Sequence, residues 1–370
     1  MNMKILHIVG KNLKDGNGIT TAVPPLIKAQ HKIKGVESKL AIITKKIESR
    51  CMDIDTYCFL NVNELENFIM NEYKPDIVVF HELYYYAYVQ VYKVLKKINI
   101  PYIITPHCSL TIAAQQKSRV KKIVANKLFF KKFISLAESI AFLNEGEKNK
   151  SIYNKNHIIC NNGIESKEIN LSLKSSEKIK IIYLSRIDLY HKGLDYLLDA
   201  IKQIDINLFE KYQFEIELYG SGNKKDTEYV TNYINNLKNK YVKFNGPIYG
   251  KEKEKLLNKS NILVLTSRLE GMPMAILESL TYGNPCIVTA GTNMDKVICE
   301  YNAGWTTDSN PNKIADTIIT AVKMYRENKQ VYIDNSLNLA IERYDWNKIA
   351  LRSIEDYKKL LEKYNRGNKI

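Results

Sequence analysis

The chain is predicted to be an α/β protein with two Rossmann-like domains, each built on a parallel sheet. Its 370 residues exceed the ~100 to 200 residues of one ordinary core, so two domains are expected. Short β-branched runs alternate with longer segments of helical spacing, and this alternation occurs twice, on either side of a polar stretch. Near-continuous apolar strands of this kind are typical of parallel sheets that helices cover on both faces.

The strands are expected in two series. The first comprises 4–9, 40–44, 76–80, 102–105 and 139–143, and the second comprises 180–184, 214–219, 242–244, 261–266 and 285–289. The Ser- and Lys-rich stretch between them predicts a linker. We therefore expect a first domain over 1–165, a linker over 166–178, a second domain over 179–345 and a C-terminal helix over 346–370. Because ligands bind beyond the carboxyl ends of parallel strands, the two domains are expected to face each other across a ligand-binding cleft.

Charge and cysteine usage narrow the partners. The formal net charge of +15 favours an anionic partner, which could be nucleic acid, an anionic lipid surface or a phosphorylated substrate. No nucleic-acid-binding motif is present, so a nucleic-acid partner is not expected. The six cysteines are scattered without a CxxC pair, which predicts neither disulfides nor structural zinc.

The chain lacks the sequence signals of secretion and of a membrane span. Its opening apolar run is too short for a secretory signal, and no run reaches the ~18 residues of a membrane helix. We therefore expect a cytoplasmic protein. The segment 116–133 has seven basic residues and no acidic one, which indicates peripheral contact with an anionic membrane surface, or else a solvated helix. Its basic residues are Lys117, Arg119, Lys121, Lys122, Lys127, Lys131 and Lys132.

Neither metal nor cofactor is expected. No His, Cys, Asp and Glu cluster has metal-ligand spacing. The one Asp-x-Asp sequence, at 53–55, does not follow a convincing strand. A serine nucleophile elbow and a P-loop are also lacking, which argues against hydrolase and NTPase functions.

The most informative segment is 261–278, with the sequence NILVLTSRLEGMPMAILE. It predicts a buried strand, a short loop and a helix whose first turn contains Pro273, a position that suits proline. Backbone N–H groups near Gly271 and Met272, together with the positive helix end, could hold a diphosphate. Glu270 on the loop could then bind sugar hydroxyls and Glu278 on the helix could bind ribose hydroxyls. The alternative is a pair of solvated glutamates beside an ordinary helix.

Three further loops carry candidate residues. Arg186 and Lys192 follow the strand 180–184 and could neutralise charge on a departing nucleoside diphosphate, although solvated surface cations are the alternative. Gly18 lies in the loop 15–20, where a glycine allows the backbone to approach a ligand closely, although an ordinary turn is the alternative. His107 follows the strand 102–105 and could donate a hydrogen bond to a sugar hydroxyl or to a developing charge, whereas a structural histidine is the alternative.

Segment 270–278 resembles the EGxP...E signature of GT-B glycosyltransferases of the retaining family 4 type. Other segments match that family in order: LSR at 184–186, HKGL at 191–194, LYGSG at 218–222, FNG at 244–246 and CNNGI at 160–164. The resemblance implies catalytic roles for His107, Arg186, Lys192 and Glu270. It implies donor-binding roles for Gly18, Gly220, Ile248, Gly271, Met272, Pro273 and Glu278. The family commonly has glycine where this chain has Cys108, which leaves the shape of that loop open.

The same resemblance implies a retaining transfer from a nucleotide-sugar, with UDP as the expected carrier, by a front-face reaction that needs no metal and no protein base. The first domain is expected to bind a glycan or lipid-linked acceptor, the C-terminal helix to cross back to that domain, and the product to serve bacterial surface polysaccharide synthesis. Two alternatives remain. One is another GT-B enzyme, such as a sugar-nucleotide epimerase or a phosphorylase, and the other is a non-catalytic partner of an active transferase.

Overall fold

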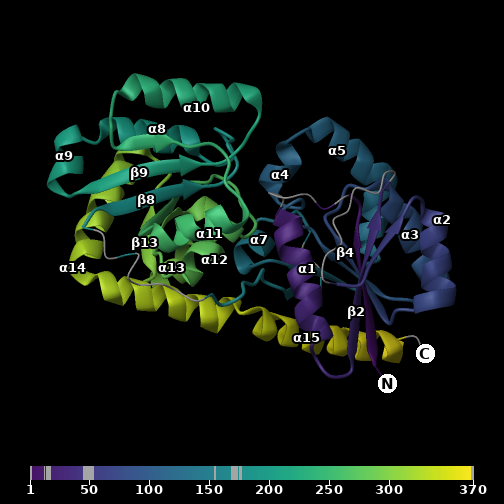
Figure 1. The fold of residues 1–370 in the computed structure, drawn as a ribbon. Coiled ribbons are helices and arrows are strands. Elements are labelled where there is room, and N and C mark those ends of the chain that lie inside the picture. Colours follow the sequence, from purple (N-terminus) through teal and green to yellow (C-terminus); the bar gives the residue numbers. More distant parts are fainter. Residues whose placement is uncertain are drawn as a thin grey trace. The chain divides into compact units, whose positions relative to one another are not determined.

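The computed structural model describes residues 2–11, 13, 18–44, 54–153, 156–167, 174 and 177–367. The chain divides into two compact units, one formed by 1–163 with 346–370 and the other by 164–345. Each unit is a parallel sheet with helices (Figure 1), which confirms the predicted α/β class. The chain changes unit between Gly163 and Ile164 and again between Asp345 and Trp346. Most of the linker expected at 166–178 lies outside the described residues.

The first unit is built on a seven-stranded sheet with the order β3-β2-β1-β4-β5-β6-β7, and every neighbouring pair is parallel. Its strands are β1 (Met3–Val9), β2 (Val36–Ile43), β3 (Thr56–Phe59), β4 (Ile77–His81), β5 (Tyr102–Thr105), β6 (Ser139–Phe142) and β7 (His157–Ile159). All five residues of β4 and all four of β5 are buried. Such strands read as continuous apolar runs because helices cover both of their faces.

The helical segments of the first unit include two of π type, η1 and η2. They are α1 (Gly18–His31), α2 (Val62–Asn67), η1 (Phe68–Tyr73), α3 (Tyr86–Lys97), α4 (Ile112–Gln116), α5 (Arg119–Ala125), η2 (Asn126–Phe130), α6 (Lys131–Ser135), α7 (Glu145–Asn149) and α15 (Trp346–Gly367). The C-terminal helix α15 lies against α1 (Figure 1). It buries Trp346, Ile349, Ile354 and Tyr357, whose spacing of three to five residues forms one apolar stripe. The C-terminal helix therefore belongs to the first unit, as the sequence predicted.

The second unit is built on a six-stranded parallel sheet with the order β10-β9-β8-β11-β12-β13. Its strands are β8 (Ile179–Leu184), β9 (Phe214–Tyr219), β10 (Val242–Phe244), β11 (Ile262–Leu265), β12 (Cys286–Thr289) and β13 (Gly304–Thr307). Its helices are α8 (Leu194–Gln203), α9 (Ile206–Lys211), α10 (Lys224–Leu237), α11 (Gly250–Lys259), α12 (Met274–Thr281), the 3-10 turn η4 (Ala290–Thr292), α13 (Asp295–Glu300) and α14 (Pro311–Tyr344).

Three strands were not predicted from the sequence. These are β3, β7 and β13, and each forms an edge of its sheet. Most of their residues are only half-buried or exposed, because an edge strand has a neighbour on one side only. Such strands lack the continuous apolar run that identified the interior strands.

The order of strands reverses once in each sheet. In the first unit the reversal lies between β1 and β4, and in the second it lies between β8 and β11. Connections leave such a pair toward opposite faces of the sheet, which opens a crevice at the carboxyl ends of the two strands. The loops after β1, β4, β8 and β11 are therefore the first places to look for a functional site.

Candidate active site

In the second unit, the loops that follow β8 and β11 lie together at the strand-order reversal. Gly193, at the end of the β8 loop, has φ +58°, and a Cβ atom there would lie 1.9 Å from the carbonyl oxygen of Thr266. The Thr266 hydroxyl donates to the Gly193 carbonyl at 2.8 Å. The Arg268 backbone N–H donates to the His191 carbonyl at 3.0 Å. The two loops thus pack backbone against backbone, which only glycine permits at position 193.

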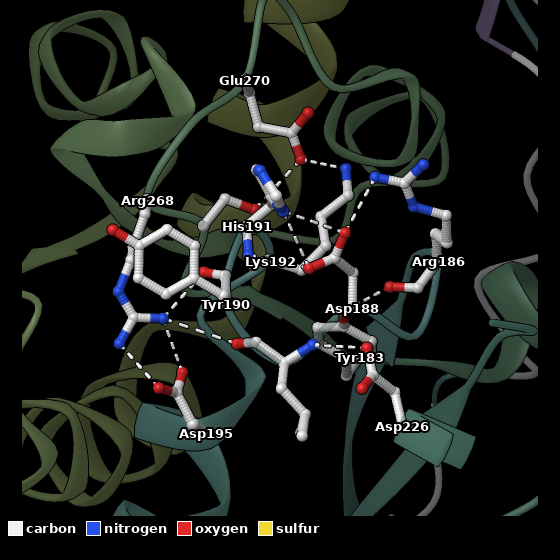
Figure 2. A network of polar contacts seen from close by, with 12 residues as sticks. Tyr183, Arg186, Asp188, Tyr190, His191, Lys192, Asp195, Asp226, Arg268 and Glu270 are labelled. Carbon is white, nitrogen blue, oxygen red and sulfur yellow. Dashed lines mark hydrogen bonds and ion pairs between the residues drawn. The ribbon is translucent and has the colours of Figure 1, made fainter. Parts of the chain in front are cut away.

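Arg268 links the same two loops through its side chain (Figure 2). Its guanidinium makes a bidentate pair with Asp195, with both contacts at 2.7 Å, and donates to the Tyr190 carbonyl at 2.7 Å. Its central carbon lies 3.6 Å from the ring centre of Tyr196. Planar bidentate and stacked contacts of this kind are specific to arginine. Arg268 therefore acts as a bracket that holds the β8 loop against the β11 loop.

Lys192 and Glu270 form an ion pair across the two loops (Figure 2). Their side chains are 15% and 12% exposed, so salt and water screen the pair less than they would a surface pair. The Ser267 hydroxyl also donates to the Glu270 carboxylate at 3.0 Å. The structure thus brings together two residues that the sequence placed 78 positions apart.

Arg186 lies nearby but is far more exposed, at 62% of its side chain. It contacts Asp188 at 3.1 Å, and Asp188 also accepts from the backbone N–H and the ring of His191. Burial alone would raise the pKa of Asp188, but the hydrogen bonds from His191 and the nearby Arg186 charge hold that pKa below its usual value. The carboxylate stays ionised and keeps Arg186 beside the Lys192–Glu270 pair.

The segment Glu270–Pro273 takes its shape from the loop after β12. The Asn293 amide donates to the carbonyl oxygens of Glu270 and Gly271 at 2.7 and 3.3 Å, and Met272 is buried. Pro273 is the N-cap of α12, which begins at Met274. The prediction that Pro273 lies in the first helical turn was therefore wrong by one residue, because its ψ of 118° is extended rather than helical.

The other predicted donor-binding residues of the second unit lie on neighbouring loops. Glu278 lies on α12 and pairs with Lys253 of α11 at 2.7 Å. Ile248 is half-buried in the loop before α11. Gly220 follows β9, where a Cβ atom would lie 1.8 Å from the Ser185 carbonyl oxygen. Its close approach therefore serves the packing of the β9 loop on the β8 loop.

In the first unit, His107 belongs to a row of three histidines. The His7 and His81 rings are buried and lie 2.8 Å apart between Nδ1 and Nε2, and the His81 Nδ1 lies 3.1 Å from the His107 Nε2. Beside this row, Lys11 pairs with Glu82 at 2.7 Å. Gly18 is the first residue of α1, and apart from its chain neighbours and its own helix, no atom of the described residues lies within 4 Å of a Cβ built on it. Residues 19 and 20 of its predicted loop also lie in α1, and residues 15–17 lie outside the described residues.

The backbone at His107 and Cys108 is left-handed, with φ of +45° and +70°. The Cys108 N–H donates to the Glu147 carboxylate at 2.5 Å, and the Leu143 N–H donates to the same carboxylate at 2.7 Å. Glu147 is buried, and its burial raises its pKa. The loop therefore keeps a glycine-like backbone at Cys108, which answers the question that the sequence left open.

Several site residues were not predicted from the sequence, namely Asp188, Asp195, Lys253, Arg268, Asn293, His7 and His81. Arg268 is close in the chain to Glu270, and Asp188 to Arg186, so a search for ions beside the predicted residues would have found them. His7 lies inside the predicted strand 4–9, where a buried polar residue is itself a signal, and His81 directly follows the predicted strand 76–80.

Comparisons with known proteins bear on the family and the fold. The family model described as "Glycosyl transferases group 1" matches residues 165–338. An uncharacterised glycosyltransferase of Methanocaldococcus jannaschii is 26% identical over 219 residues, which span 55% of this chain and 54% of that protein. A second uncharacterised glycosyltransferase of the same organism is 25% identical over 362 residues, or 93% of this chain and 95% of that protein. The chain thus spans about half the length of the first relative and nearly all of the second.

Among solved structures, the Anabaena protein HepE in complex with UDP and glucose has a TM-score of 0.70. It is 16% identical, and the superposition covers 97% of this chain and 100% of HepE. A likeness at that identity shows the fold. The fold is therefore the GT-B fold, and the sequence matches are to glycosyltransferases. The second unit, with the Lys192–Glu270 pair, contains the whole of the match to glycosyl transferases group 1.

Proposed function

We propose that the protein is a retaining glycosyltransferase of the family 4 type that moves a sugar from a UDP-sugar to a glycan or lipid-linked saccharide, in bacterial surface polysaccharide synthesis. The observation that carries this proposal is the Lys192–Glu270 ion pair beside Arg186, at the carboxyl ends of β8 and β11. Two cations and a carboxylate at one crevice match the two ends of a nucleotide-sugar, which are an anionic diphosphate and a neutral polyol. The complex of HepE with UDP and glucose supports UDP as the carrier.

The proposed reaction divides the ion pair between the two parts of the donor. The diphosphate takes Lys192 as its partner, and the Glu270 carboxylate is released to accept hydrogen bonds from sugar hydroxyls. As the bond between the anomeric carbon and the diphosphate oxygen breaks, its electrons pass to the diphosphate, where Lys192 and Arg186 stabilise the charge. The acceptor hydroxyl bonds to the same face of the anomeric carbon, and its proton passes to the departing phosphate. Protein cations stabilise the leaving group in this scheme, so we propose that no metal is needed.

Glu278 and Lys253 support the nucleoside end of the proposed donor site. Their 2.7 Å contact holds the Glu278 carboxylate in place on α12. Ile248 lies in the loop that leads into α11, the helix that carries Lys253. We propose that Glu278 accepts from ribose hydroxyls while the backbone near Ile248 contacts the base.

A thermal-shift measurement with UDP, GDP and ADP tests the donor site. We expect UDP at about 100 times its dissociation constant to stabilise the protein by ~2.7 kcal/mol. The Lys192→Ala variant should lose most of this shift, whereas Lys202→Ala, an exposed lysine on α8, should keep it. The absence of a shift with all three nucleotides would contradict the proposal.

Product analysis then separates transfer from the alternatives. UDP-glucose is incubated with and without a polyprenyl-diphosphate-linked saccharide, and the products are identified by proton NMR. An α-linked product that forms only with the saccharide indicates retaining transfer. A changed sugar on UDP without acceptor would indicate an epimerase, glucose 1-phosphate formed from a glucan and phosphate would indicate a phosphorylase, and no turnover despite UDP binding would indicate a non-catalytic partner.

We further propose that the protein acts as a cytoplasmic, peripheral membrane protein through the surface formed by 112–132 of the first unit. This surface has no acidic residue, and six of its seven basic side chains are exposed, while Lys122 turns inward to the Ala114 carbonyl. Apolar side chains are exposed between them, with Val120 75% exposed and Leu128 64% exposed. Basic and apolar side chains mixed on one helical surface suit anionic lipid head groups. Among the described helices, none combines the length and apolarity that a membrane span requires.

Cosedimentation with lipid vesicles tests this surface. Vesicles with phosphatidylglycerol should bind the protein, and vesicles of phosphatidylcholine alone should not. Replacing Lys117, Lys121 and Lys127 with glutamine should weaken binding by ~3 kcal/mol, because each lysine near an anionic surface contributes ~1 kcal/mol. Glutamine at the exposed Lys224, Lys225 and Lys240 of the second unit is the matched control, and equal loss in both triple variants would contradict a specific surface.

A further inference from the structure

The row of three histidines in the first unit ends at Gln30, and this end determines the orientation of the whole row. Gln30 lies on α1, is fully buried, and its Oε1 is 2.9 Å from the His7 Nε2 and 2.9 Å from the Ser38 hydroxyl. Its amide nitrogen donates to the Ser353 hydroxyl at 2.9 Å. Ser353 on α15 donates its own proton to the Ala350 carbonyl at 2.7 Å, so its oxygen accepts from Gln30.

These bonds leave the Gln30 oxygen facing His7. A serine hydroxyl has one proton, and that of Ser353 is already donated to Ala350. Gln30 must therefore present its amide nitrogen to Ser353 and its carbonyl oxygen to His7 and Ser38. Because a carbonyl oxygen only accepts, the proton of the neutral His7 ring is on Nε2, and the His7 Nδ1 is an acceptor.

The same reasoning passes along the row. The His7 Nδ1 accepts, so the His81 Nε2, 2.8 Å away, carries the His81 proton. The His81 Nδ1 is then an acceptor, and the His107 Nε2, 3.1 Å away, carries the His107 proton. The remaining ring nitrogen, the His107 Nδ1, has a lone pair and no hydrogen-bond partner among the described residues.

Burial keeps the row neutral, which this reasoning requires. It lowers the pKa of His7 to about 4 and that of His81 well below its ordinary value. Burial also lowers the pKa of His107 to about 4, with Glu82 acting to raise that pKa and Lys11 to lower it. At neutral pH each ring therefore has one proton, and the Gln30 oxygen decides which nitrogen has it.

We infer that Gln30, His7 and His81 are positioning residues that hold His107 in the Nε2–H tautomer, so that its Nδ1 accepts a hydrogen bond from a hydroxyl of a sugar bound to the first unit. This inference rests on the proposed function. It also reverses the direction expected from the sequence, which had His107 donating to the sugar or to a developing charge. The neutral tautomer selects a neutral polyol hydroxyl and disfavours a phosphate oxygen, since a phosphate dianion has no proton to donate.

Nitrogen-15 NMR of the histidine rings tests the inference without any activity assay. Protein labelled at histidine gives ring signals whose shifts distinguish the two tautomers, and His107→Gln identifies the His107 signal. We expect the Nε2–H tautomer for His107 in the wild type and a mixture of tautomers in Gln30→Met, where the acceptor is lost. Ser38→Ala, which removes another contact of Gln30 but keeps its oxygen on His7, should retain the Nε2–H tautomer.

A wild-type His107 with the proton on Nδ1, or an unchanged tautomer in Gln30→Met, would overturn the inference. The kinetic counterpart is a lower kcat in Gln30→Met than in Ser38→Ala at equal KM for UDP-sugar, and equal kcat values in the two variants would overturn the catalytic part. If the tautomer is as expected but no nucleotide binds the protein, the proposed function fails while the assignment of the row stands. The two failures are therefore distinguishable.

Discussion

At the strand-order reversal of the second unit, between β8 and β11, the side chains are charged, with Lys192 and Glu270 half-buried and Arg186 exposed. At that of the first unit, between β1 and β4, the row of three histidines is kept neutral by burial, with the Lys11–Glu82 pair beside it. The same topology therefore supports two kinds of recognition. Fixed cations suit an anionic diphosphate, whereas a neutral acceptor of known orientation suits a hydroxyl. The difference arises from burial, because an unpaired charge is costly in the dry interior that encloses His7 and His81.

The largest expected effect comes from removing a cation at the charged site of the second unit. Lys192→Ala should lower kcat by ~10²- to 10³-fold, the usual result of removing one preorganised group that stabilises transition-state charge. Arg186→Ala should lower kcat less, by ~10-fold, because the 62% exposed guanidinium acts through water. Steady-state release of UDP measures both, with Lys202→Ala as control. A larger loss at Arg186 than at Lys192 would show that burial does not rank the two cations.

The neutrality of the histidine row in the first unit is tested by the pH dependence of stability. A histidine in the unfolded chain titrates near 6.5, and His7 and His107 in the fold titrate near 4. Between these values the unfolded chain binds more protons, so the free energy of unfolding should fall as pH drops from 6.5 to 4, by ~1.4 kcal/mol per pH unit for each histidine. Above pH 6.5 the contribution is complete. Urea denaturation at several pH values measures the slope of the free energy of unfolding against pH. In His107→Gln this slope should be smaller by the contribution of one histidine, and a slope equal to that of the wild type would mean that His107 is charged in the fold.

A smaller effect is expected at the bracket that holds the charged loops together. Arg268→Lys loses the bidentate contact with Asp195 and the stacking on Tyr196, and should lower the free energy of unfolding by ~1–2 kcal/mol. The thermal shift by UDP should fall as well, because the bracket keeps Lys192 opposite Glu270. The exposed pair Arg343–Glu300 offers a control, since Arg343→Lys should change stability by less than ~0.5 kcal/mol. Unchanged UDP binding in Arg268→Lys would separate loop packing from donor binding.

The smallest effect concerns the backbone of the His107 loop. Cys108 has φ +70°, which costs an L-residue ~1–2 kcal/mol, and glycine relieves this cost while losing ~0.5–1 kcal/mol of chain entropy. Cys108→Gly should therefore raise the free energy of unfolding by up to ~1 kcal/mol in urea titrations. Cys299→Gly in α13 should act in the opposite direction, because a helix disfavours glycine. Destabilisation by Cys108→Gly would mean that the thiol makes contacts worth more than the strain.

Much of the charged site could be predicted from local patterns. Continuous apolar runs predict interior strands, and such runs precede Arg186, Lys192 and Glu270. The place of these residues at the carboxyl end of a sheet therefore follows from the sequence alone. Their partners could not be predicted in the same way. Asp195 and Arg268 are 73 positions apart, and no local periodicity records which loops meet.

The histidine row was less accessible to prediction. His107 was found because it follows a predicted strand, and His81, which also follows one, was not singled out. His7 lies within a strand, and its ring contacts Gln30 of α1. The direction of the hydrogen bond that His107 makes is set by Gln30 and Ser353, which are 323 positions apart. The sequence around His107 contains no information about the Gln30 oxygen, which lies at the other end of the hydrogen bonds through His7 and His81.

The alternation of apolar runs and helical segments is enough to predict two parallel α/β units, because each continuous apolar run by itself predicts a buried strand. Which strands lie side by side at the reversal depends on how the connecting helices pack, and that packing is a property of the whole unit. The fold therefore decides that the loops after β8 and β11 share one crevice, that Lys192 meets Glu270, and that His107 presents a lone pair rather than a proton. Residue type supplies the chemistry, and long-range packing sets its direction.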